Sequence, residues 1–190
     1  MQTENMYGTY FSNPLSDLIQ NENYSRSTQV YVNAFADIKL WKGLVFRTEY
    51  AANYNYNTGY RFTPSYDYEF FKQQSSANRS AGNGSNWTLK TYLTYNGTFG
   101  KHNVSVMAGH EAQENNWESL DGSRTNFLFN SVHELNAGDA TTAKANSSRG
   151  SSAIESYFGR LNYNFADRYL LTATLRADGS SSFAKESRWG

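Results

Sequence analysis

The sequence predicts an all-β fold of antiparallel, up-and-down strands. Three observations predict it. Apolar and polar residues alternate with a period of two, tight turns join the alternating segments in pairs, and long polar stretches separate the pairs. No apolar run reaches the roughly eighteen residues that a membrane-spanning helix needs. We therefore expect about six strands arranged as three hairpins.

The first hairpin is predicted over residues 30–40 and 44–56, with a tight turn at Lys42-Gly43. In both segments the even-numbered positions are mostly apolar or aromatic. The charged side chains fall at odd positions and therefore on the opposite face. These charged residues are Asp37, Lys39, Arg47 and Glu49.

The second and third hairpins follow the same pattern. The second is predicted over residues 87–99 and 104–108, and the third over residues 157–165 and 169–176. Their charged side chains again lie opposite the apolar set: Lys90, Glu111, Arg160 and Arg176.

Long polar connections are predicted from about Phe62 to Asn86 and from about Asn115 to Ser152, both rich in Ser, Asn and Gly. Short turns and long loops thus alternate. This asymmetry is typical of outer-membrane barrels, which have short periplasmic turns and long external loops. We place the turns at Lys42, Lys101 and Asp167 on the periplasmic side, and we expect ligand recognition in the long loops.

The separation of charged from apolar side chains predicts a lipid-facing surface. A Lys or Arg that faces lipid at the bilayer midplane costs about 2–4 kcal/mol, so a barrel would enforce this separation. A soluble sheet with one buried face would enforce the same alternation. The many Tyr and Trp residues of the apolar face favour the barrel, because they suit the interfacial girdles of a membrane protein. The expected fold is an antiparallel up-and-down transmembrane β-barrel segment.

Composition argues against several other classes of function. Seventeen Lys and Arg balance seventeen Asp and Glu, so no basic field would attract nucleic acid. No metal site is expected, because cysteine is absent and no spacing would bring together two of the three histidines, His102, His110 and His133. Three carboxylates could include an acid/base pair but are expected to be merely solvated: Glu111, Glu114 and Glu118. We expect no enzyme activity, no catalytic residue and no cofactor.

The segment from Ser156 to Phe183, which contains Arg160 and the run Arg176-Ala177-Asp178-Gly179, closely resembles a stretch typical of SusC/RagA-family barrels. Shorter pieces resemble the same family in the same order: Asn13-Pro14-Leu15, Leu40-Trp41-Lys42-Gly43-Leu44, Thr98-Phe99-Gly100-Lys101-His102-Asn103 and Gly109-His110-Glu111. Arg188-Trp189-Gly190 looks like the family's start of a further strand. The resemblance covers almost the whole chain.

The resemblance implies a TonB-dependent nutrient importer, multi-pass in the outer membrane of a Bacteroidetes-type Gram-negative bacterium. It would carry glycans or peptides together with a SusD-like surface lipoprotein, and TonB would act through a plug region. Residues 1–190 would be a partial barrel domain, an incomplete part of a roughly 22-stranded barrel. No plug domain, signal peptide or C-terminal closing strand is recognised in them.

The resemblance also bears on individual residues. Four residues match the family motif and are interpreted as structural: Arg160, Arg176, Asp178 and Gly179. No substrate-binding residue can be carried over from the family, because external loops vary with cargo. Trp117 is the candidate for stacking on a substrate, whereas Trp87 is better interpreted as an interfacial anchor.

Two alternative hypotheses remain open at this stage. The first is a small self-contained outer-membrane barrel, which six strands without a closing segment argue against. The second is a soluble carbohydrate-binding β-sandwich, which would have denser turns and a more aliphatic core. The sequence does not name the cargo.

Overall fold

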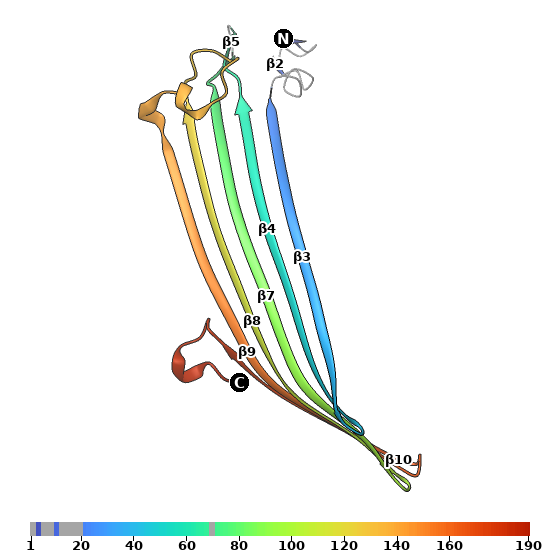
Figure 1. Cartoon of the computed structure of the whole chain (residues 1–190). Helices are drawn as coiled ribbons and strands as arrows, with labels where there is room; N and C mark the ends of the chain where they lie inside the picture. Colours follow the sequence, from blue (N-terminus) through green and yellow to red (C-terminus); the bar gives the residue numbers. More distant parts are fainter. Residues whose placement is uncertain (1–2, 5–9, 12–20, 69–70) are drawn as a thin grey trace. The chain divides into compact units, whose positions relative to one another are not determined.

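The computed structural model describes residues 3–4, 10–11, 21–68 and 71–190 (Figure 1). The Asn13-Pro14-Leu15 motif lies outside the described residues. Six long strands form one antiparallel sheet whose order is β10-β9-β8-β7-β4-β3. These strands are β3 (Glu22–Trp41), β4 (Leu44–Thr63), β7 (Ser76–Phe99), β8 (His102–Thr125), β9 (Lys144–Phe165) and β10 (Tyr169–Ser180).

Short elements make up the rest of the described chain. Two small sheets pair β1 (Thr3–Glu4) with β2 (Tyr10–Phe11) and β5 (Tyr66–Tyr68) with β6 (Phe71–Gln73). Three 3-10 helices follow: η1 (Leu135–Ala137), η2 (Ala140–Thr142) and η3 (Lys185–Ser187). No helix within the described residues has the length and apolarity that crossing a bilayer would require.

The three predicted hairpins are confirmed as β3-β4, β7-β8 and β9-β10. In the first turn Gly43 has φ +80°, and a Cβ there would collide with the backbone oxygen of Asn96. A side chain is therefore excluded on two grounds. In the third turn Ala166 and Asp167 also have positive φ, and Asn164 supports Asp167 with two side-chain hydrogen bonds.

The strands extend well beyond the predicted ones, which is a correction to the expected loops. The predicted loop from Phe62 to Asn86 ends early, because β7 already begins at Ser76. Of the predicted loop from Asn115 to Ser152, only residues 126–143 lie between β8 and β9. These Ser-, Asn- and Gly-rich stretches lack apolar alternation, yet a neighbouring strand satisfies their backbone hydrogen bonds just as well.

The chain divides into two compact units, and the first holds the only buried hydrophobic residues among those described. This first unit comprises Met1–Thr28, Tyr56–Asn83 and Glu118–Arg149. Its core is Phe62, Ala77 and Phe127, with the rings of Phe62 and Phe127 edge to face at 5.4 Å. Ser75 is buried beside them and accepts a 2.7 Å hydrogen bond from the Phe127 backbone N–H. The segment between β8 and β9 is thereby fastened to the start of β7.

The second unit comprises Gln29–Asn55, Gly84–Trp117 and Gly150–Gly190, and its apolar side chains are exposed. Val32 is 50% exposed, Leu93 41% and Leu175 81%. Nothing within the described residues of this unit covers them. A soluble β-sandwich would bury this face against a second sheet, and the described residues of this unit contain no such sheet. The uncovered face fits the predicted barrel segment instead.

Candidate functional site

Charged side chains of the second unit interact across strands and mark one face of the sheet. The Arg47 guanidinium on β4 donates hydrogen bonds to both carboxylate oxygens of Asp37 on β3 and lies 3.5 Å from the Glu49 carboxylate. Glu49 also accepts a 3.0 Å hydrogen bond from the Tyr92 hydroxyl on β7. Because these residues come from three strands, the contacts confirm that the predicted charged face exists.

The same face continues over the next strands around Glu111 on β8. This carboxylate is only 12% exposed and lies 2.9 Å from the Lys90 ammonium and 3.1 Å from the Arg176 guanidinium. Arg176 also donates to Asp178 at 2.8 Å and to the buried Ser156 hydroxyl at 3.0 Å. One acid is thus held between two cations from β7 and β10.

Trp117 lies on β8, not in a loop as the sequence predicted. It stands six residues after Glu111, so strand alternation places both on the same face. A Cβ at Gly150 would come within 2.7–2.9 Å of the Trp117 indole ring, so that residue must be glycine for the ring to rest there. The indole is 47% exposed. The Trp117 indole therefore packs over Gly150 on one side and keeps an accessible surface, which suits it to stacking on an apolar ligand face.

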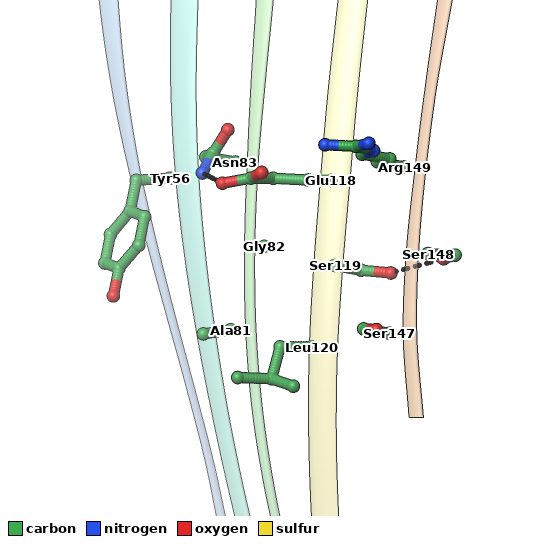
Figure 2. A pocket seen from close by; sticks show the side chains of 10 residues that line it. All are labelled: Tyr56, Ala81, Gly82, Asn83, Glu118, Ser119, Leu120, Ser147, Ser148 and Arg149. Atoms are coloured by element: carbon green, nitrogen blue, oxygen red, sulfur yellow. Dashed lines mark hydrogen bonds between the residues drawn. The ribbon is translucent and has the colours of Figure 1, made fainter. Parts of the chain in front are cut away.

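An open hollow of about 670 Å³ lies within the first unit (Figure 2). Its polar groups include Glu118 on β8 and Arg149 on β9, and Asn83 on β7 donates to the Glu118 carboxylate. Tyr56 and Leu120 add apolar surface. Within the described part of the chain, neither Glu118 nor Arg149 has an ion-pair partner. The hollow can therefore offer a carboxylate, a guanidinium and an apolar surface to one ligand.

Trp117 and Glu118 cannot serve the same ligand. Successive side chains of a strand point to opposite faces, so these neighbours lie on opposite sides of β8. Sequence reasoning identified Trp117 but missed the hollow, because its residues lie in polar stretches without alternation. Glu118 was expected to be merely solvated, and Asn83 and Arg149 carried no recognisable signal.

Comparison with known proteins gives consistent similarities, although no protein-family model matches the chain. TonB-dependent receptor P3 of Formosa agariphila is 31% identical over 195 residues, covering 97% of this chain and 19% of that receptor. TonB-dependent receptor SusC of Bacteroides thetaiotaomicron is 33% identical over 108 residues, covering 55% of this chain and 10% of SusC. The structure of the RagAB peptide transporter matches with a TM-score of 0.89 at 21% identity, over 98% of this chain and 21% of the transporter chain.

The chain is related to the SusC/RagA-like TonB-dependent receptors. It spans about a fifth of the length of the receptor P3 and of the RagAB chain. The resemblance expected from the sequence motifs is thus confirmed, and the match to RagAB supports the barrel-type sheet. These relatives are named as receptors and transporters, not as enzymes.

The four SusC/RagA motif residues occupy distinct places on β9 and β10. Arg176 and Asp178 belong to the ion-pair group around Glu111. Arg160 is exposed and stands opposite Thr174 in the β9-β10 register. Gly179 lies beneath Trp189, since a Cβ at Gly179 would come within 2.9 Å of the indole. Their structural role stays a prediction.

The residues 188–190 of this SusC/RagA-like chain pair with the end of β10. Backbone hydrogen bonds join Asp178 to Gly190 in both directions and run from the Ser180 N–H to the Arg188 oxygen. Trp189 bridges Gly179 in antiparallel register. This pairing fits the start of a further strand that the motif suggested.

The histidines have separate partners. His102 bonds the Tyr163 hydroxyl at 2.7 Å, His110 bonds Glu155 at 3.0 Å, and His133 lies 3.2 Å from Glu22. No group of three metal-binding side chains occurs among the residues that the structure describes.

Proposed function

We propose that this chain forms part of the wall of an outer-membrane, TonB-dependent nutrient importer. The observation that carries the proposal is the separation of faces in the second unit. Ion-paired side chains around Glu111 occupy one face, and exposed apolar side chains such as Leu93 occupy the other. The charged face would line the barrel interior, and the apolar face would contact lipid.

The whole importer would carry a glycan or a peptide, would work with a SusD-like surface lipoprotein, and would couple to TonB through a plug region. Support comes from the relatives: one is named SusC, and RagAB is named a peptide transporter. These assignments extend from proteins of which this chain spans only a part.

The face assignment can be tested by introducing positive charges on either face in the full-length protein. Leu93→Arg places a charge on the apolar face and should cost about 2–4 kcal/mol, which would impair barrel assembly. Ala36→Lys should act in the same direction. Asn96→Arg, on the charged face of the same strand, is the control and should be milder. The measurement is the fraction of folded barrel, seen as its faster migration in unheated samples on a denaturing gel. Equal loss in all variants would contradict the proposal.

Transport can be tested in the native bacterium. Deleting the gene should abolish growth on one glycan or peptide source, and the restored wild-type gene should rescue it. Affinity purification of the full-length protein should recover a surface lipoprotein. Normal growth on every tested source, with no lipoprotein recovered, would argue against the importer.

We assign Trp117 to cargo contact, because it shares the charged face with Glu111 and keeps an accessible ring surface. Trp117→Ala should weaken cargo binding, whereas Trp117→Phe should retain part of it through stacking. Gly150→Val should mimic the loss by displacing the indole. Calorimetric titration of the purified importer with its cargo is the measurement. Unchanged affinity in Trp117→Ala would remove the assignment.

A further inference from the structure

A second hollow, of about 440 Å³, lies within the second unit, bordered by two indole side chains. Trp87 on β7 and Trp189 beside β10 both line it, together with Glu114, Glu155 and Arg188. Trp87 and Glu114 belong to the strand positions that carry the apolar set, at odd positions on β7 and even positions on β8. The hollow therefore opens on the apolar face.

Its two carboxylates have no permanently charged partner. Glu114 accepts hydrogen bonds from the Trp87 indole N–H at 3.2 Å and from the Asn116 amide at 2.9 Å. Glu155 accepts from the Tyr157 hydroxyl at 3.0 Å and contacts His110 at 3.0 Å. Within the described residues, no Lys or Arg lies within ion-pair distance of either carboxylate.

The cation that lines the hollow, Arg188, also has no oppositely charged partner within the described chain. The Arg188 guanidinium donates to the backbone oxygen of Phe183 at 3.3 Å, and no carboxylate of the described chain pairs with it. Separate negative and positive groups thus line one cavity without neutralising each other. Charge complementarity then calls for a ligand that carries both an ammonium and an anion.

We infer that this hollow binds a phosphoethanolamine-type head group, with its ammonium near Glu114 and Glu155 and its phosphate on Arg188. A guanidinium matches the geometry of a phosphate, and an indole face attracts an ammonium group. The inference rests on the proposed function, because a head group reaches this face only if the face contacts lipid. Two sources carry this chemistry: phosphatidylethanolamine, and lipopolysaccharide that bears phosphoethanolamine.

The test uses the full-length protein in lipid nanodiscs, with bound lipid counted by native mass spectrometry. Phosphatidylethanolamine should bind about fivefold better than phosphatidylglycerol of the same acyl chains, since about one charge interaction distinguishes them. A parallel arm compares lipopolysaccharide with and without its phosphoethanolamine group, and the arm with the preference identifies the source.

Substitutions of residues that line the hollow test whether the preference for the ethanolamine lipid arises there. Arg188→Gln should lower binding of both phospholipids, whereas Glu155→Gln should reduce mainly the preference for the ethanolamine lipid. Arg160→Gln, which removes an exposed charge outside the hollow, is the matched control and should change neither. Equal binding with and without the ethanolamine group in both arms would overturn the inference, as would an unchanged preference in both hollow variants.

The lipid preference of the wild-type protein tests the head-group site even where a variant does not fold. Failure of the wild-type protein to enter the nanodisc as a folded barrel would overturn the proposed function as well. A folded, inserted barrel without a head-group preference would overturn the head-group site alone.

Discussion

Glu111 is expected to stabilise the barrel wall by holding two cations from different strands. The perturbation is Glu111→Gln, which keeps the size of the side chain and removes its charge. The carboxylate is only 12% exposed and accepts from Lys90 at 2.9 Å and from Arg176 at 3.1 Å. The substitution would leave these two cations close together without an anion between them.

The size of the effect follows from burial. A hydrogen bond to a charged group contributes about 1.5–3 kcal/mol, whereas an exposed ion pair contributes about 0–1 kcal/mol. Lys90 and Arg176 are 42% and 44% exposed, so their two contacts fall between these limits. We expect Glu111→Gln to lower the free energy of unfolding by about 2 kcal/mol. Lys39→Gln, which removes an exposed charge of the same face, should cost at most about 0.5 kcal/mol.

The assay is urea unfolding of the full-length protein in detergent micelles. A double-mutant cycle with Glu111→Gln and Arg176→Gln should give a coupling free energy of about 1 kcal/mol or more. The reasoning is refuted if the two substitutions are additive, or if Glu111→Gln costs no more than Lys39→Gln.

Four further outcomes are expected. A cysteine at Leu128, which is 86% exposed, should react with an impermeant label in intact cells, and one at Lys101 should not; the reverse would invert the sidedness. Ser75→Ala should speed amide exchange in the segment after β8, because the Phe127 N–H loses its acceptor. Unchanged exchange would show that this hydrogen bond does not hold the segment to the start of β7. Hydrogen bonds from Thr141 hold the pKa of the Asp139 carboxyl below its ordinary value, so the η2 turn should loosen only as pH falls below about 4, and Asp139→Asn should remove that pH dependence in exchange measurements. Residues 1–190 expressed alone should form no stable pore in planar bilayers, since β3 and β10 are unpaired with each other at the sheet edges; a steady conductance would contradict this.

The sequence predicted the hairpins and both faces of the second unit because a physical constraint acts there residue by residue. A side chain such as Leu93 must be apolar if it faces lipid, and Glu111 must avoid lipid, so alternation is visible in the sequence. The turns were equally visible, because Gly43 meets a backbone oxygen that excludes any side chain.

The first unit was harder to predict, for the opposite reason. Strands such as the start of β7 at Ser76 are stabilised by backbone pairing with neighbours distant in sequence, and this pairing does not require apolar side chains. The hollow around Glu118 is lined by residues of four strands, and no local sequence pattern indicates that these residues come together. Burial of Phe62 by Phe127 likewise joins residues from separate segments.

The cross-strand ion pairs also have a consequence for how the sheet is assembled. A slip of one residue between neighbouring strands would move every side chain of the slipped strand to the other face. Arg176 reaches from β10 past β9 to Glu111 on β8, so a slip of β9 or β10 would separate that pair and turn a charge toward hydrocarbon. A misaligned strand pairing therefore has a higher free energy in the membrane than the correct pairing. The cross-strand ion pairs thus help to select the correct strand register during insertion.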